Sequence, residues 1–234
     1  MIIGITGQTG AGKSTVCRYL AQSGAAVVDA DVIARAVIES ESVKTALAEA
    51  FGDDILSGGN IDRRLLAKRA FSSRENTDRL NGIMHPPIIE KMLSAAQSAL
   101  KNGAVAAIFD APQLFESGLD KYCDAVVAVT ADASVRKKRI IERDGLTQDQ
   151  ADDRLKAALP DSFFKSRCDF SVCTDSGDPK SAADMILNFI GERRAELEKA
   201  DKSGNISCGN CNNNLRRCDR LRQADALSLS DEIQ

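Results

Sequence analysis

Short runs of apolar, often β-branched residues alternate along the chain with longer segments of helical periodicity. Near-continuous apolar runs are typical of strands in a parallel sheet that helices cover on both faces. The predicted strands lie at 2–6, 25–29, 104–110, 125–130 and 170–173. The predicted helices lie at 13–23, 31–51 with a break, 62–83, 87–101, 132–143, 148–158 and 179–199. This alternation predicts an α/β fold with a mostly parallel sheet of five strands flanked by helices.

Two segments interrupt the alternation and suggest a domain organisation. Residues 31–102 carry only helical signals and are too many for a simple crossover, so we expect a helical insertion that grips a substrate. A smaller excursion at about 144–168 is expected to form a lid. The remaining segments, 1–30, 103–143 and 169–200, then form the core of one domain over residues 1–200.

The amino-acid composition of the chain changes at residue 201. Residues 201–234 are polar and rich in Asn, Ser and Gly, with few large apolar groups to offset the entropy of ordering. We expect a disordered tail with a short helix near 215–227. The tail cysteines, Cys208, Cys211 and Cys218, lack a fourth nearby ligand, which disfavours a structural zinc site.

The composition and net charge of the chain limit the classes of partner that we expect. The chain has 234 residues, of which 43% are hydrophobic and 28% charged, and its net charge is −3. Nucleic acid and membrane surfaces usually select a basic excess, so we expect neither as a partner. No run approaches the roughly 18 apolar residues of a membrane span. Seven cysteines, an odd number, without a visible secretory signal favour a cytoplasmic protein, which we expect to be a monomer.

A glycine-rich segment follows the first predicted strand. The letters GQTGAGKS at 7–14 match the phosphate-binding loop pattern, in which curled backbone N–H groups and a helix N-terminus hold an anion. Lys13 is expected to reach the β- and γ-phosphates of ATP, and the Ser14 hydroxyl to ligate Mg²⁺. A glycine-rich turn without a ligand is the alternative. The expected nucleotide-binding residues are Gly10, Ala11, Gly12, Lys13, Ser14 and Thr15.

A phosphate loop alone does not separate kinases, motor ATPases, transporters and GTPase switches. No Asn-Lys pair occurs, which disfavours a switch GTPase that reads guanine. The letters LSGGN at 56–60 look like the signature loop of transporter ATPases. A helical segment follows them here, so we interpret them as a surface turn between helices.

Two carboxylates stand at the end of the second predicted strand, where ligands bind in such sheets. Asp29 lies in or near the strand, and Asp31 lies just beyond it. One interpretation is a helix cap, because Asp is common at helix starts. The other is an acceptor-side base that orients and deprotonates a substrate hydroxyl facing the γ-phosphate.

Here the sequence resembles a known family. GITGQTGAGKST followed by VVDADVIAR is similar to the dephospho-CoA kinases, the last enzymes of coenzyme A synthesis. Further matching segments follow in the expected order over residues 1 to about 195. They are Gly59-Asn60-Ile61-Asp62-Arg63-Arg64 with Leu66, Leu80-Asn81, His85-Pro86, Pro112-Gln113-Leu114-Phe115-Glu116, Arg139 with Arg143-Asp144, and Cys168-Asp169-Phe170.

The resemblance implies a phosphoryl transfer from ATP to the ribose 3′-hydroxyl of dephospho-CoA, which yields coenzyme A and ADP. It implies the fold of nucleoside-monophosphate kinases, with a five-stranded core, a helical substrate domain and a lid. It also implies that Asp31 is the catalytic base and that Arg35 lies near the bound substrate.

A basic cluster accompanies the phosphate loop. Arg136, Arg139 and Arg143 share one face of a predicted helix. This face is either solvated or directed at the phosphates, whose charge guanidinium groups neutralise well. We predict that Arg139 is catalytic and that Arg143 binds the nucleotide, while Lys165 and Arg167 close over the site from the lid.

Three further residues are candidates. His85, the only histidine, is either a packed or capping residue at a helix start before Pro86, or a substrate contact within the insertion. Glu116 has support from the family resemblance and is predicted on the substrate side. Asp110 ends the third strand, where a Walker B carboxylate would hold Mg²⁺ through water, although the resemblance does not require an acid there.

Two alternative functions remain at the level of sequence. One is a different kinase of the same fold that acts on a nucleoside or nucleotide. The other is a nucleotide-binding regulatory protein that uses its cysteine-containing tail.

Overall fold

The computed structural model describes residues 1–175 and 178–203. The predicted tail lies outside these ranges, except for residues 201–203, which belong to the last helix. The predicted helix near 215–227 and the three tail cysteines therefore fall outside the described residues.

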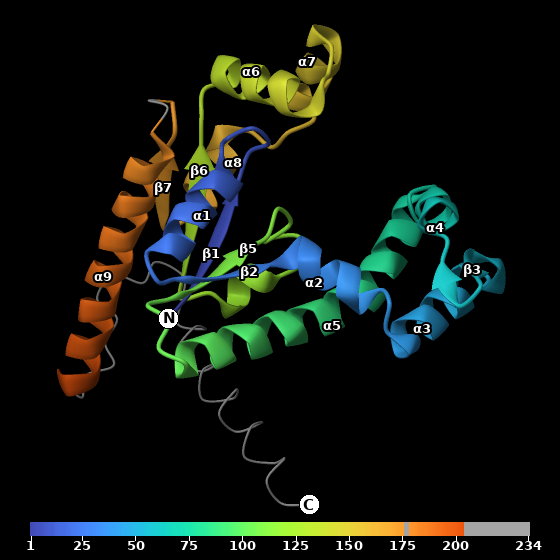
Figure 1. Cartoon of the computed structure of the whole chain (residues 1–234), viewed down its shortest axis with the longest axis horizontal. Coiled ribbons are helices and arrows are strands. Elements are labelled where there is room, and N and C mark those ends of the chain that lie inside the picture. The colour runs from blue at the N-terminus through green and yellow to red at the C-terminus, as the bar shows by residue number, and fades with distance from the viewer. Residues whose placement is uncertain (176–177, 204–234) are drawn as a thin grey trace, which may run out of the picture.

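A parallel five-stranded sheet forms the centre of the molecule (Figure 1). Its order is β2-β5-β1-β6-β7, and every neighbouring pair is parallel. All five predicted strands are confirmed, although the third begins at Ala107 instead of residue 104. The strands are β1 (Ile2–Gly7), β2 (Ala26–Asp29), β5 (Ala107–Asp110), β6 (Ala125–Thr130) and β7 (Phe170–Cys173).

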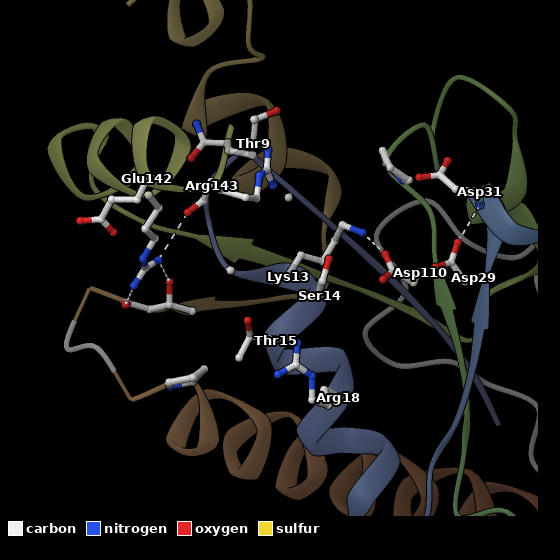
Figure 2. A pocket seen from close by; sticks show the side chains of 18 of the residues that line it. Thr9, Lys13, Ser14, Thr15, Arg18, Asp29, Asp31, Asp110, Glu142 and Arg143 are labelled. Carbon is white, nitrogen blue, oxygen red and sulfur yellow. Dashed lines mark hydrogen bonds and ion pairs between the residues drawn. The ribbon is translucent and has the colours of Figure 1, made fainter. Parts of the chain in front are cut away.

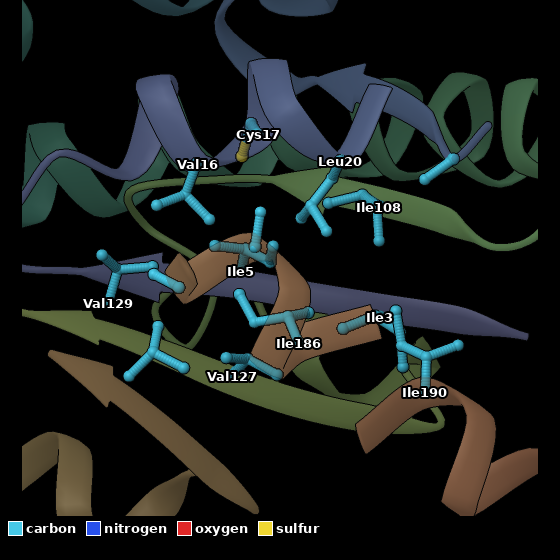
Figure 3. Close-up of a cluster of buried hydrophobic side chains, with 14 of the residues drawn as sticks. Ile3, Ile5, Val16, Cys17, Leu20, Ile108, Val127, Val129, Ile186 and Ile190 are labelled. Carbon is cyan, nitrogen blue, oxygen red and sulfur yellow. The ribbon is translucent and has the colours of Figure 1, made fainter. Parts of the chain in front are cut away.

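Helices cover both faces of the sheet. On one face, α1 (Lys13–Gln22) and α9 (Pro179–Ser203) pack on alternate side chains of the strands (Figure 3). On the other face lies α5 (Arg74–Lys101). Strand β5 shows the alternation, because Ile108 belongs to the first core and Phe109 to the second. This burial on both faces explains why the strands are almost wholly apolar.

The segment between β2 and β5 carries the predicted helices and one feature that the sequence did not predict. Its helices before α5 are α2 (Ala30–Val37), α3 (Glu41–Phe51), the short 3₁₀ helix η1 (Asp53–Ile55) and α4 (Arg63–Ala70). The LSGGN letters form a turn, as predicted. That turn joins a two-stranded hairpin, β3 (Leu56–Ser57) and β4 (Asn60–Ile61). Gly58 and Gly59 both have positive φ, which tight hairpin turns require.

The predicted helix boundaries around 62–101 are wrong. The chain breaks after α4, where the Ser73 hydroxyl accepts from the Asn76 N–H at 3.2 Å and caps a new helix. That helix, α5, continues without a break through Pro86 and Pro87. Proline usually ends or kinks a helix because it lacks an N–H and clashes with the preceding turn. Here α5 packs on two hydrophobic clusters through Ile88, and this packing outweighs the local preference.

The segment between β6 and β7 contains three helices. They are α6 (Ala133–Asp144), α7 (Gln148–Lys156) and α8 (Asp161–Arg167). The sequence did not predict α8, because seven residues with adjacent phenylalanines carry no helical period. Its stability comes from tertiary contacts, because Phe164 is buried and the Phe163 ring meets Phe115 edge-on at 5.6 Å. A further 3₁₀ helix, η2 (Leu119–Tyr122), precedes β6.

The sheet topology places a crevice at the end of β1. Strand β1 lies between β5 and β6. Strands β5 and β2 extend the sheet on one side of it, and β6 and β7 extend the sheet on the other side. Ligands of open α/β sheets bind outside the carboxyl ends of the strands at such a switch point. The glycine-rich loop directly follows β1. Among the helices within 1–175 and 178–203, none is long and apolar enough to cross a membrane.

Candidate active site

The loop after β1 takes a conformation that only glycine adopts readily. Gly10 and Gly12 have φ of 82° and 85°, in the left-handed region. A Cβ on Gly10 would also lie 2.9 Å from the Arg136 carbonyl oxygen on α6. The Ala11 N–H donates to the Gln8 carbonyl at 3.0 Å and tightens the turn. The loop is thus curled against α6 and leads directly into α1.

A cavity of about 980 Å³ opens in front of this loop (Figure 2). Its lining includes a group of carboxylates from the end of β2, the start of α2 and the end of β5, and a group of arginines from the helices after β1 and β6. The carboxylates are Asp29, Asp31 and Asp110, and the arginines are Arg18, Arg139, Arg143 and Arg154. A further carboxylate, Glu142, lines the cavity from α6 beside Arg139 and Arg143, so both signs of charge occur around the phosphate loop.

The carboxylate side contains a shielded ion pair. Asp29 and Asp110 are register partners on the neighbouring strands β2 and β5. The Lys13 ammonium, from the first turn of α1, pairs with the Asp110 carboxylate. The two side chains are 14% and 10% exposed. Burial lowers the pKa of Lys13 below its usual value, while the nearby Asp31 and Asp29 act in the opposite direction.

The two aspartates around the start of α2 have different positions. The Asp29 carboxylate accepts from the backbone N–H groups of Asp31 and Val32, at 2.8 and 3.0 Å, and so caps α2. Asp31 lies in the first turn of that helix, is exposed, and lines the cavity. The capping role considered for Asp31 therefore belongs to Asp29.

Arg139 on α6 is held against the phosphate loop. Its guanidinium donates from Nη1 to the Thr174 hydroxyl at 2.9 Å and from Nη2 to the Thr174 carbonyl at 2.8 Å. Nη1 also lies 3.5 Å from the Gly10 carbonyl oxygen. Arg136, on the same helix, is buried and donates from Nε to the Ala131 carbonyl at 3.0 Å. Arg139 and Arg143 line the cavity, while Arg136 lies beneath the loop.

Arg143 and Arg154 share one carboxylate. Arg143 donates to Asp144 at 2.7 and 2.9 Å, and Arg154 on α7 donates to the same carboxylate at 2.6 Å. The bonds from Arg143, with a smaller contribution from Arg154, lower the pKa of Asp144. Asp144 thus joins the end of α6 to α7 and positions two guanidinium groups beside the cavity.

Comparison with protein families gives an assignment that is consistent with a phosphate-binding site. The dephospho-CoA kinase family model matches residues 1–178. The chain belongs to the dephospho-CoA kinase family. A dephospho-CoA kinase of Fusobacterium nucleatum is 43% identical over 177 residues, which cover 75% of this chain and 90% of that protein. One of Geobacillus kaustophilus is 35% identical over 201 residues, covering 85% and 99%.

Solved structures share the fold. A Thermus thermophilus protein superposes with a TM-score of 0.67 at 29% identity, covering 80% of this chain and 96% of its own. The dephospho-CoA kinase from Campylobacter jejuni superposes with a TM-score of 0.61 at 24% identity, covering 82% and 97%. The predicted P-loop kinase fold is therefore confirmed.

Most of the residues predicted to be catalytic or to bind the nucleotide line the cavity. These are Gly10, Gly12, Lys13, Ser14, Thr15, Arg139 and Arg143, together with Asp31. Ala11, in the same loop, is buried and does not line the cavity. Arg35, His85 and Glu116 lie outside the cavity lining. Arg35 is one helical turn beyond Asp31 on α2, so the two share a face.

His85 has a different setting from the predicted one. It lies in the interior of α5, not at a helix start. The imidazole is half-buried, and burial lowers its pKa below the usual value. The capping role considered for His85 is therefore wrong, whereas packing is consistent with its place on α5 near Met84 and Ile88, which are partly buried against a hydrophobic cluster.

Several lining residues received no role from the sequence, among them Gln8, Arg18, Glu142, Arg154 and Thr174. Gln8 donates from its side-chain amide to the Leu159 carbonyl at 3.2 Å, which joins the loop to the segment after α7. Thr174 stands just after the last strand, at the same sheet edge as the loop, and this position was the available signal. Arg167 lies over the Phe163 and Phe115 rings, at 4.6 and 5.7 Å from their centroids, and outside the cavity lining.

Proposed function

We propose that this chain transfers the γ-phosphoryl group of ATP to the ribose 3′-hydroxyl of dephospho-CoA, producing coenzyme A and ADP. The observation that carries the proposal is that Asp31 and the phosphate loop line one cavity. A kinase needs a phosphate cradle and a hydroxyl-orienting carboxylate facing the same space. Membership of the dephospho-CoA kinase family supplies the substrate.

The donor half consists of the loop and the arginines. Backbone N–H groups and the N-terminus of α1 receive the triphosphate, and Lys13 moves from Asp110 to the phosphate oxygens. Arg139, Arg143 and Arg154 offset the charge that develops on the transferred group. In this scheme Arg139 has two functions, because it also contacts the loop backbone through Gly10.

The acceptor half consists of α2 and its neighbours. Asp31 accepts the proton of the 3′-hydroxyl and aligns its oxygen with the γ-phosphorus. Arg35, one turn further along α2, binds an anionic group of dephospho-CoA. His85 and Glu116 contribute to the wall of the substrate site on α5 and after β5. In the same proposal, residues 31–102 form the substrate-binding part and about 144–168 the lid.

The residues present fit a Mg²⁺ ion that arrives with ATP. Magnesium prefers oxygen ligands and usually binds through one or two protein groups plus phosphates. Within 1–175 and 178–203, no group of three or more His, Cys, Asp or Glu side chains is placed to hold a metal by itself. The Ser14 hydroxyl and the Asp110 carboxylate both line the cavity and supply such oxygens. Ser14 would be the direct ligand, and Asp110 would hold the ion through water; the bound ion would neutralise phosphate charge.

A competition among acceptors tests this function. The purified chain is incubated with ATP, Mg²⁺ and an equimolar mixture of dephospho-CoA, AMP and adenosine, and the products are quantified by mass spectrometry. AMP and adenosine present ribose hydroxyls without the pantetheine arm. We expect phosphorylation of dephospho-CoA alone. Preferential phosphorylation of AMP or adenosine would instead support a nucleotide or nucleoside kinase of the same fold.

A further inference from the structure

One buried hydroxyl contacts both the phosphate loop and Arg139. Thr174 directly follows β7 and is 1% exposed. Its hydroxyl lies 2.7 Å from the Ala11 carbonyl oxygen and accepts from Arg139 Nη1 at 2.9 Å. The Thr174 N–H donates to the Thr130 carbonyl at 3.0 Å, which fixes the residue to the end of β6. The hydroxyl is therefore attached to the rigid edge of the sheet.

The direction of the hydroxyl proton follows from the distances. Two carbonyl oxygens lie near the Thr174 hydroxyl: that of Ala11 at 2.7 Å and that of Thr130 at 3.4 Å. A hydroxyl donates only one proton. The Ala11 carbonyl is the nearer acceptor and lies at the usual distance for an O–H···O bond, whereas the Thr130 carbonyl already accepts the Thr174 N–H. The proton therefore goes to Ala11.

This bond fixes the orientation of one peptide unit in the loop. The bond between Ala11 and Gly12 is trans, so its C=O and N–H point in opposite directions. The Ala11 carbonyl faces Thr174, and the Gly12 N–H consequently faces away from it. Gly12 lines the cavity and immediately precedes α1. An N–H at that position belongs to the set that binds phosphate at a helix N-terminus.

We propose that Thr174 is a positioning residue for the nucleotide phosphates. Its hydroxyl holds the Ala11–Gly12 peptide with the N–H turned toward the phosphates and simultaneously orients the Arg139 guanidinium. A Cβ on Gly12 would make only ordinary contacts, 3.5 Å from Arg139 Nη1 and 3.7 Å from the Thr174 hydroxyl, so it is the φ of 85° that favours glycine there. The inference rests on the proposed function only in taking ATP as the donor.

Two substitutions separate the hydroxyl from the shape of the side chain. Thr174→Val keeps the shape and removes the hydroxyl, while Thr174→Ser keeps the hydroxyl. Calorimetry with ATP, without an acceptor, gives the dissociation constant. We expect Thr174→Val to weaken ATP binding about tenfold, the effect of one misplaced charge-assisted contact, and Thr174→Ser to stay within about twofold of the wild type. The KM for dephospho-CoA at saturating ATP should be unchanged in both variants.

Several results of these measurements would overturn the proposal. Wild-type ATP affinity in Thr174→Val, or equal loss in Thr174→Ser, would overturn the proposal. A fall in kcat that matches a smaller folded fraction, with unchanged ATP affinity, would also overturn it, since that is the signature of a purely structural residue. If Thr174→Val does not fold, Thr174→Cys replaces it, because a thiol is a much weaker donor; wild-type ATP affinity in Thr174→Cys would contradict the proposal. Because binding is measured without acceptor, the result is independent of whether dephospho-CoA is the substrate.

Discussion

The Lys13 ammonium and the Asp110 carboxylate form an ion pair in the wall of the cavity, with both side chains largely shielded from solvent. The lysine that is expected to hold the β- and γ-phosphates is therefore already paired with a carboxylate at the end of β5. We therefore expect nucleotide binding to be an exchange, in which phosphate oxygens replace the carboxylate and Asp110 becomes available to Mg²⁺. The pair also avoids the high cost of an isolated charge in a partly buried position.

Substitution of Asp110 tests this exchange. Asp110→Asn keeps the shape and removes the competing charge, so we expect ATP without Mg²⁺ to bind about three- to tenfold more tightly. Turnover with Mg²⁺ should fall at least about tenfold, because the metal ion loses the carboxylate that would hold it through water. The free energy of unfolding should drop by about 1–3 kcal/mol, less than for a fully buried pair because the cavity admits water. Asp78→Asn, an equal charge change on the exposed surface of α5, is the control; weaker metal-free binding in Asp110→Asn would rule out the exchange.

Substitutions of the two aspartates at the start of α2 should have different effects, one on turnover and the other on the free energy of unfolding. Asp31→Asn removes the base without touching the helix cap, so kcat should fall by about 10²–10⁴ while the ATP dissociation constant stays within about threefold. The unfolding free energy should not change. Steady-state kinetics and urea denaturation measure both quantities.

Asp29→Ala is the matched variant. It removes the carboxylate that accepts from the Asp31 and Val32 N–H groups, so we expect a loss of about 0.5–2 kcal/mol in unfolding free energy. If instead Asp31→Asn is destabilised and retains its turnover, the assignment of the base to Asp31 is wrong.

The contrast between these residues shows what the sequence was able to predict. Local patterns located the five strands, the phosphate loop and the break between α2 and α3. They did not decide which of two nearby aspartates caps α2, because both spacings suit a cap. They also missed the continuation of α5 through Pro86 and Pro87, which depends on burial against clusters from distant segments. Arg154 enters the site through Asp144 on another helix, which no local pattern shows, whereas the one signal for Thr174 was its place directly after the last strand.

Arg154 on α7 is predicted to contribute to nucleotide binding. Arg154→Gln removes its charge from the cavity, and we expect the KM for ATP to rise about three- to tenfold, with kcat changed by less than about threefold. Lys156→Gln, on the same helix but paired with Asp153 and outside the cavity lining, provides the control for charge. Equal KM values for the two variants would show that Arg154 does not contact the nucleotide.

His85 should make stability depend on pH. Burial holds the pKa of the imidazole in the folded chain below its usual value, whereas the unfolded chain keeps the usual pKa. As the pH falls from 7 through 6.5 toward 5, the unfolded state takes up the proton more readily, so the free energy of unfolding decreases. Denaturant titrations should show a smaller decrease over this range in His85→Asn than in the wild type. An equal decrease in both chains would mean that His85 is not responsible.

The most direct test of the account is the identity of the phosphorylated product. The wild-type chain and Asp31→Asn are each supplied with ATP, Mg²⁺ and dephospho-CoA, and the position of the new phosphate is determined by phosphorus NMR against authentic coenzyme A. We predict that the wild type forms a ribose 3′-phosphate identical to coenzyme A, and that Asp31→Asn forms the same product at least about a hundredfold more slowly. A phosphate at another position, no transfer to dephospho-CoA, or equal rates in the two chains would contradict the account.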